Sequence, residues 1–188
     1  MNKVDKAITF AAKKHANQKR KGFNQSYMYH PLEVLSLVTL LTDDEDVWCG
    51  ALLHDTVEDT DTTIEEVRSE FGDRVADMVA DESEDKRGNV NKADTWVDRK
   101  KEAIDHIKSI TNTGSKMICL CDKVSNLRSM QLLQFDKGDH FLDAFNMKDP
   151  KMHYWYYNEL KDALSELKDY AIYKEFAFLI DAVFGRYL

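Results

Sequence analysis

The sequence predicts an all-α protein built from about eight helices. Two prolines and seven glycines are spread over 188 residues, so few positions favour a turn. Strict alternation of apolar and polar residues, which would indicate strands, is hard to find. Where apolar residues show a period, it is the 3.6-residue period of a helix with one buried face.

The first helices are placed by apolar spacing and by residues typical of helix ends. The first is expected near residues 2–20, where one stripe carries Val4, Ala7, Ile8, Ala11 and His15. Pro31 favours the first turn of a second helix near 31–41, which puts His30 at its N-terminal edge. Asp44 is available as the N-cap of a third helix near 44–57.

The remaining elements follow from further caps and apolar patterns. Thr62 and Glu65 form a capping box for a short helix that ends near Phe71 and Gly72. Other helices are expected near residues 73–82, 95–110, 115–133, 151–169 and 171–186, with a charged loop at 83–95 and an irregular segment at 135–150. Because no linker, repeat or low-complexity tract divides the chain, residues 1–188 should form a single domain.

Composition limits the partners and the location. The 26 basic and 34 acidic residues give a net charge of −8, whereas nucleic-acid binding needs a broad basic surface, so no nucleic-acid partner is expected. No window holds the ~20 apolar residues of a membrane span, and the N-terminus lacks the apolar region of a signal peptide. Cys49, Cys119 and Cys121 lie in apolar helical patterns and are interpreted as buried thiols. We therefore expect a soluble cytoplasmic protein without a membrane partner; the sequence does not indicate an oligomeric state.

Positive charge is concentrated in one short segment before His30. Within nine residues the chain carries Lys13, Lys14, Lys19, Arg20 and Lys21. Such a cluster attracts a small polyanion, although Lys13 and Lys14 fit a solvated helix face equally well.

The most informative segment is the hexapeptide His54-Asp55-Thr56-Val57-Glu58-Asp59, with His30 before it and Asp122 after it. Two imidazoles and two carboxylates, from His30, His54, Asp55 and Asp122, form a mixed nitrogen and oxygen set suited to Mn, Fe, Ni or Zn. His54 and Asp122 also follow apolar runs, where an unpaired charge is costly unless an ion or a partner compensates it. One metal ion meets both requirements; the alternative is a buried salt bridge, for example from Asp122 to Lys123 or Arg128.

Further polar residues share helical faces with these ligands. Glu58 and Asp59 lie one turn beyond His54 and Asp55 if the helix continues. Asn126 and Ser129 follow Asp122 at i+4 and i+7, so an amide and a hydroxyl line the same face. The other histidines, His15, His106, His140 and His153, have no comparable setting and are interpreted as structural or surface residues.

These residues resemble the HD-domain superfamily and, more closely, the hydrolase domain of RelA/SpoT-type enzymes and the single-domain small alarmone hydrolases. The resemblance runs in family order over residues 7–130. It is carried by Arg20-Lys21, Tyr27-Met28-Tyr29-His30-Pro31, Ala51 through Thr60, Phe71-Gly72, Ser83-Glu84-Asp85-Lys86, Arg99-Lys100 and Asp122 through Arg128. The Glu-Asp pair after His-Asp is the feature that separates alarmone hydrolases from other HD proteins.

The resemblance implies a helical HD-domain bundle that holds a single Mn²⁺ by His30, His54, Asp55 and Asp122. It implies removal of the 3′-diphosphate of (p)ppGpp as pyrophosphate, with Glu58 and Asp59 activating the water. The nucleotide substrate would be contacted by Arg20, Lys21, Tyr27, Asn126, Ser129 and a tyrosine that is either Tyr154 or Tyr156.

Some positions depart from the family pattern. Ser26 stands where a proline usually precedes the tyrosine, Cys121 replaces a common alanine, and residues 131–150 follow no family pattern. With no room for a synthetase domain, a dedicated hydrolase is expected. The alternatives are a phosphohydrolase for ppApp, the 2′-phosphate of NADPH or a nucleoside monophosphate, and a module that binds alarmone without turnover. The intact Glu58-Asp59 pair speaks against the last, because a pure binder gains nothing from carboxylates beside an anion.

Overall fold

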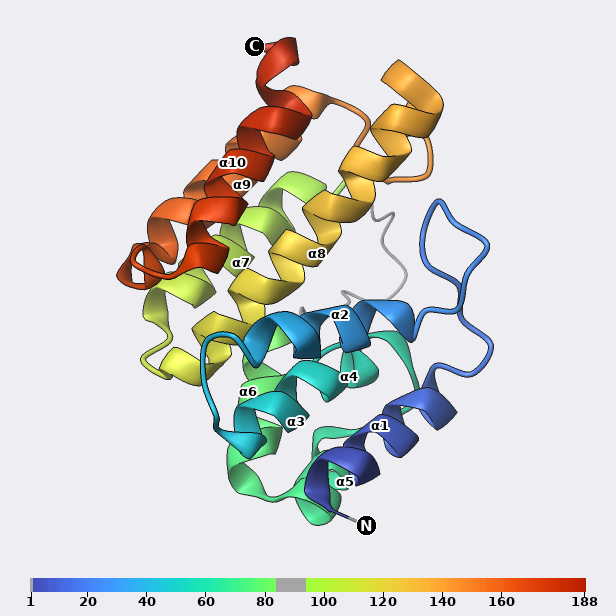
Figure 1. The fold of residues 1–188 in the computed structure, drawn as a ribbon, viewed down its shortest axis with the longest axis vertical. Coiled ribbons are helices and arrows are strands. Elements are labelled where there is room, and N and C mark those ends of the chain that lie inside the picture. Colours follow the sequence, from blue (N-terminus) through green and yellow to red (C-terminus); the bar gives the residue numbers. More distant parts are fainter. Residues whose placement is uncertain (1, 84–93) are drawn as a thin grey trace. The chain divides into compact units, whose positions relative to one another are not determined.

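The structure, a computed structural model, describes residues 2–83 and 94–188. Over these residues the chain forms ten α-helices and three short 3₁₀ helices, and its sole β pairing is an isolated bridge between Lys19 and Ser26. The all-α prediction is therefore confirmed, with slightly more helices than expected. Figure 1 shows the helices in chain order. The chain divides into two compact units, Met1–Asp85 with Ile110–Asp122 and Lys86–Ser109 with Lys123–Leu188.

The first unit contains six complete helices and the beginning of a seventh. These are α1 (Lys3–Lys14), α2 (Tyr29–Val38), α3 (Glu45–Leu53), α4 (Thr56–Asp59), α5 (Ile64–Phe71), α6 (Asp73–Glu82) and the first part of α8 (Thr113–Lys137). The helix α3 packs against α1, α2 and α6, so it is the central element of this unit. Its Gly50 permits a close approach to α8, because an added Cβ would lie 2.7 Å from the Ile118 side chain.

The core of the first unit is made of small and medium apolar side chains from α1, α3, α5 and α6. Its buried members are Ala7, Ala11, Cys49, Leu52, Leu53, Val67, Phe71, Val75, Ala76 and Val79. Burial of this kind supplies most of the stability of a helix whose length alone would not sustain it. All three cysteines are buried, as the sequence predicts.

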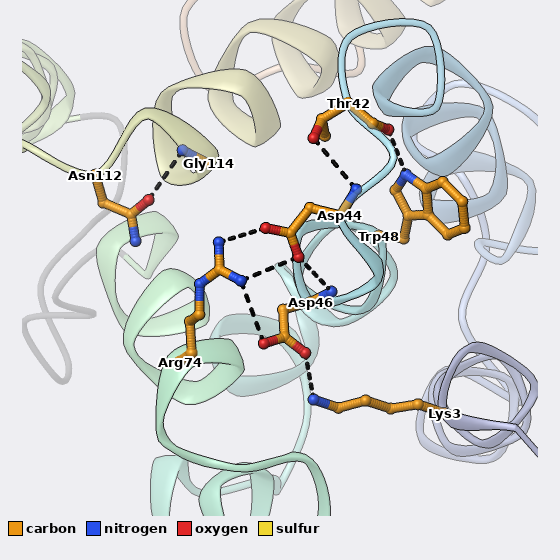
Figure 2. A network of polar contacts seen from close by, with 8 residues as sticks. All are labelled: Lys3, Thr42, Asp44, Asp46, Trp48, Arg74, Asn112 and Gly114. Atoms are coloured by element: carbon orange, nitrogen blue, oxygen red, sulfur yellow. Dashed lines mark hydrogen bonds and ion pairs between the residues drawn. The ribbon is translucent and has the colours of Figure 1, made fainter.

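A polar network holds the beginning of α3 (Figure 2). Asp44 is the N-cap, as predicted, and its side chain accepts from the Asp46 amide at 3.0 Å. Arg74 on α6 forms a forked ion pair with Asp44, and Lys3 on α1 pairs with Asp46. These contacts fix the N-terminus of α3 to α1 and α6.

The second unit contains α7 (Trp96–Ser109), the rest of α8, α9 (Pro150–Ala163) and α10 (Ala171–Phe184). The helix α9 packs against both α7 and α10. Aromatic rings fill the space between them: His153 stacks on Phe184 with ring centroids 5.8 Å apart and contacts Trp96 edge-on at 5.4 Å. His153 is thus a structural histidine, as predicted.

Several predicted boundaries are wrong. The first helix ends at Lys14, well before residue 20, and α8 continues to Lys137, where Gly138 adopts a positive φ of 56°. The N-cap of α5 is Thr63, whose hydroxyl accepts from the Glu66 amide, so the predicted Thr62–Glu65 capping box is one residue out of register.

Two other predicted helices are split or shorter in the structure. The helix expected at 44–57 is split at His54 and Asp55. The helix expected at 151–169 ends at Ala163, followed by a 3₁₀ turn at Ser165–Leu167. Most of the loop expected at 83–95 lies outside the described residues. Across the described part of the chain, no helix is long and apolar enough to cross a membrane.

Candidate metal centre

His54 lies at the break between α3 and α4. Its Nδ1 lies 2.7 Å from the Ala51 carbonyl, and the Thr56 hydroxyl donates to the Leu53 carbonyl at 2.6 Å. Both carbonyls would accept amide hydrogens in a continuous helix, so these side chains compete with the helix for its acceptors. The hydrogen bond to Ala51 puts the proton of neutral His54 on Nδ1 and leaves Nε2 as an acceptor directed away from α3.

Acceptor atoms from four residues of the first unit converge at this point. Nε2 of His54 lies 3.3 Å from Nε2 of His30 and 3.0 Å from Oδ2 of Asp55. Oδ1 of Asp122 lies 3.0 Å from the His30 nitrogen and 3.7 Å from the His54 nitrogen. Ligands about 2.1 Å from one ion are about 3.0 Å apart at right angles and about 3.4 Å apart in a tetrahedron, so the spacing fits one small cation.

The site is buried, and its charges require compensation. His30, His54 and Asp122 are each less than a tenth exposed, and one ligand atom from each lies within 4.8 Å of the others. Burial alone would lower the pKa of His54, but the charge of Asp55 and hydrogen bonds to Asp122 and Asp55 outweigh it and raise this pKa well above its usual range. A group of acceptors that attracts a proton this strongly also suits a divalent cation.

Asp55 differs from the other three in its contacts. Its Oδ2 lies 3.4 Å from the His30 nitrogen and also accepts a hydrogen bond from the Tyr27 hydroxyl. Burial would raise its pKa, yet the charge of His54 and hydrogen bonds from His30 and His54 lower it well below the usual range. Asp55 is therefore an ionised carboxylate oriented by Tyr27. Burial and the same carboxylate raise the pKa of the Tyr27 hydroxyl, which keeps it a donor.

The alternative of a salt bridge from Asp122 to Lys123 or Arg128 stays a prediction. The Arg128 guanidinium donates to Glu175 at 2.7 Å, within the second unit. Asp122 lies against His30 and His54.

The segment between α1 and α2 forms a tight turn that carries Arg20 and Lys21. Phe23 N donates to the Arg20 carbonyl at 3.0 Å, and Gly22 has a φ of 84°, as at the third position of a type II turn. The turn is closed by Arg20 N, which donates to Gln25 O at 3.1 Å. Arg20 also lies over the ring of Tyr27, 6.0 Å from its centroid.

Glu58 and Asp59 lie in the single turn of α4, shortly after His54 and Asp55. The Asp59 amide donates to the Asp55 carbonyl at 2.8 Å, so one helical turn separates these two residues despite the break at His54. Asp59 is exposed and Glu58 is half-buried. Their role in activating water stays a prediction.

The remaining predicted substrate residues belong to the second unit. Asn126, Ser129 and Tyr154 are half-buried there, and their contact with a nucleotide stays a prediction. Of the two tyrosines predicted to contact the nucleotide, Tyr156 is the less accessible. It is buried against Trp96, and the Lys100 ammonium lies 4.9 Å from the centroid of its ring. Tyr154 is the more accessible of the two.

Two residues next to the site were not singled out from the sequence as functional. His15 is completely buried, and its ring contacts the ring of Tyr27. Gln18 is half-buried and is hydrogen-bonded to the Asp59 carbonyl and to the Tyr27 amide. In the sequence, their position just before the Arg20-Lys21 pair is the feature that could have pointed to them.

Known proteins are similar to this chain in sequence and in fold. The chain is 39% identical over 127 residues to the guanosine-3′,5′-bis(diphosphate) 3′-pyrophosphohydrolase MESH1 of Danio rerio, covering 65% of this chain and 66% of that protein. It is 34% identical over 138 residues to the guanosine-3′,5′-bis(diphosphate) 3′-pyrophosphohydrolase of Aquifex aeolicus. There the match covers 71% of this chain but 18% of the relative, so the chain spans a small part of that longer protein.

Among solved structures, one described as a metazoan ortholog of SpoT that hydrolyses ppGpp aligns with a TM-score of 0.75 and 26% identity. It covers 100% of this chain and 96% of that one. A protein of Listeria monocytogenes EGD-e aligns with a TM-score of 0.70 and 30% identity over 86% of this chain and 99% of that one. A family model described as HD domain matches residues 7–140. Since this match extends over well more than half of the sequence, the protein belongs to the HD-domain family.

Proposed function

We propose that residues 1–188 act as a single metal-dependent phosphohydrolase domain that hydrolyses the 3′-diphosphate of (p)ppGpp. The observation that carries this proposal is that buried candidate ligand atoms of His30, His54 and Asp122 lie within 4.8 Å of one another. The Glu58-Asp59 pair follows His54 in the next turn of the chain. Relatives named for this activity share more than a third of the aligned residues. A cytoplasmic location agrees with three buried thiols.

The residues are assigned distinct roles. His30, His54, Asp55 and Asp122 would hold one Mn²⁺, which we prefer to Zn²⁺ because half of the ligands are carboxylates. When bound, the ion lowers the pKa of a water molecule and neutralises phosphate charge. Glu58 and Asp59 orient the attacking water and accept its proton.

The reaction adds one water across one bond. The water oxygen forms a bond to the phosphorus attached to the 3′ oxygen, and the bond between that phosphorus and the 3′ oxygen breaks. The products are GDP or GTP and pyrophosphate. Arg20 and Lys21 stabilise the negative charge of the diphosphate, while Tyr27, Asn126, Ser129 and Tyr154 contact the nucleotide.

The test is a panel of nucleotides incubated with the purified chain and Mn²⁺, with products separated by ion exchange. We expect ppGpp to yield GDP and pyrophosphate, activity to disappear in excess EDTA, and Mn²⁺ to restore it. Hydrolysis of ppApp, of NADPH at its 2′-phosphate or of a nucleoside monophosphate in preference to ppGpp would overturn the substrate assignment. Full activity after prolonged dialysis against EDTA would overturn the metal mechanism.

A further inference from the structure

We propose that His15 and Gln18 are positioning residues for the hydrolytic site. They fix the backbone of Asp59 relative to the turn that carries Arg20 and Lys21. This inference rests on the proposed function, since it assigns these two residues a role in that reaction.

Gln18 connects three parts of the first unit. Its side-chain amide nitrogen donates to the Asp59 carbonyl at 2.5 Å, and its side-chain oxygen lies 2.7 Å from Nδ1 of His15. Its backbone carbonyl accepts from the amide of Tyr27 at 2.9 Å. One residue therefore contacts the end of α1, the segment that leads to α2, and the turn of α4.

The orientation of the Gln18 amide follows from its partners. The Asp59 carbonyl can only accept, so the NH₂ group must face it and the oxygen must face His15. An amide oxygen also can only accept, so Nδ1 of His15 carries the hydrogen. Both hydrogen bonds, from His15 to Gln18 and from Gln18 to Asp59, thus have a defined donor and acceptor.

His15 carries an energetic cost that packing alone does not explain. The residue is 0% exposed, and its Nε2 has no hydrogen-bond partner in the structure. A buried polar atom left in this state lowers the stability of the folded chain, a penalty that an apolar side chain of similar volume would avoid. The benefit of a histidine at this position lies in its Nδ1 donor and its flat ring.

The ring of His15 extends the same connection toward the metal centre. It lies on the ring of Tyr27 with centroids 4.8 Å apart, and the Tyr27 hydroxyl donates to Asp55. His15 therefore orients both Gln18, which holds Asp59, and Tyr27, which holds a proposed ligand. A displacement of about 1 Å at a reacting group can cost on the order of 10²-fold in rate, so such support matters for catalysis.

The first test changes the Gln18 side chain and leaves its backbone intact. Gln18→Glu keeps an acceptor for His15 but cannot donate to the Asp59 carbonyl, and Gln18→Met keeps the shape without either bond. We expect both to lower kcat on ppGpp by about 10- to 100-fold with wild-type Mn²⁺ content and nearly unchanged Tm. KM should change much less, because the backbone bond to Tyr27 that holds the turn is retained.

The matched control is Asn146→Asp, which makes the same amide-to-carboxylate change at an exposed position of the second unit. It should keep the wild-type kcat. An unchanged kcat in both Gln18 variants would overturn the proposal. A loss of kcat that merely follows a loss of Tm and of Mn²⁺ would do the same, because it would show a general structural role.

The second test separates the two functions of His15. In His15→Asn the side-chain amide takes the place of Nδ1–H, whereas His15→Phe keeps a ring without a donor. If the hydrogen bond to Gln18 is what positions Asp59, the asparagine variant retains the higher kcat. The opposite order, at comparable Tm, would overturn the role of Nδ1.

Hydrogen exchange makes the result independent of the substrate assignment. Wild-type turnover of ppGpp is measured first, and its absence would refute the proposed function alone. The exchange of peptides covering residues 19–28 and 56–62 then still tests the connection. Gln18→Glu should accelerate exchange of residues 56–62 and Asn146→Asp should not; equal exchange in all three proteins would overturn the inference.

Discussion

The hydrogen on the His54 ring determines what the centre can bind. Because Nδ1 donates to the Ala51 carbonyl, neutral His54 presents a lone pair at Nε2, beside His30, Asp55 and Asp122. Without a positive charge between them these acceptors would repel one another. Each side chain is also held from behind, His54 by Ala51 and Asp55 by Tyr27, so the geometry exists before an ion binds.

The first prediction separates metal binding from chemistry at the residue scale. Asp55→Ala should lose both Mn²⁺ and activity, since it removes a ligand and the partner of the Tyr27 hydroxyl. Glu58→Gln should keep the ion and bind ppGpp, but its single-turnover rate should fall by about 10²- to 10⁴-fold because an amide cannot accept the proton. Elemental analysis, calorimetry and rapid-quench kinetics on the three proteins provide the measurements.

Asp61→Asn is a suitable control, because that carboxylate is exposed and pairs with Lys14 on the surface. It should match the wild type in all three measurements. A Glu58→Gln protein without manganese would make Glu58 a ligand, and one with the wild-type rate would exclude it from the mechanism.

At the scale of elements, the sequence predicts helices well and their interruptions poorly. Of the predicted stripe, Ala7, Ala11 and His15 are buried and Val4 and Ile8 are half-buried, yet the helix stops at Lys14. No glycine or proline marks that end. The chain leaves the helix where Gln18 binds the Asp59 carbonyl, a partner 41 residues away that no local pattern reveals.

The break between α3 and α4 has a similar origin. Within His54-Asp55-Thr56, two side chains take backbone carbonyls of the preceding turn, which a search for helical periodicity does not detect. The candidate ligands could be named from the sequence, because buried histidine and aspartate in apolar runs need compensation. Their supporting contacts could not, because these depend on which segments meet in the folded chain.

The second prediction concerns the N-terminus of α3, where Asp44 both caps the helix and pairs with Arg74 (Figure 2). Asp44→Ala should cost on the order of 1 kcal/mol for the cap and up to about 1 kcal/mol more for the partly exposed ion pair. Asp44→Asn retains a capping oxygen and should lose only the contribution of the ion pair with Arg74. Urea unfolding at pH 7 gives both differences.

The pH dependence distinguishes the two contributions. The hydrogen bond from Arg74 holds the pKa of Asp44 below its usual range in the folded chain. Ionised Asp44 therefore adds stability above the unfolded pKa of about 3.9, and this is lost as the pH falls through the folded pKa. The difference in free energy of unfolding between wild type and Asp44→Asn should disappear below about pH 4. A difference that does not change with pH would mean that it comes from the helix cap and not from the ion pair.

For the whole molecule, the net charge of −8 opposes the approach of the proposed substrate ppGpp, which is itself a polyanion. The basic segment at residues 13–21 offsets this repulsion only in part. Lys14 is paired with Asp61 and Glu66, each at 3.1 Å, and Lys19 donates to Asn24. Under the proposed function, the turn that carries Arg20 and Lys21 supplies a local attraction for the phosphates.

The last prediction isolates this local attraction from the overall charge. Lys21→Ala and Lys168→Ala each make the net charge more negative by one, but Lys168 is an exposed residue of the second unit. Lys21→Ala should raise KM and weaken the salt dependence of kcat/KM, because one screened contact with phosphate is lost. Lys168→Ala should change neither beyond the small effect of net charge. The measurement is kcat/KM for ppGpp from low salt to about 1 M, where the screening length falls to about 3 Å and the Lys21→Ala and wild-type curves should converge. Equal salt slopes for the two variants would mean that Lys21 acts through overall charge and not through contact with the substrate.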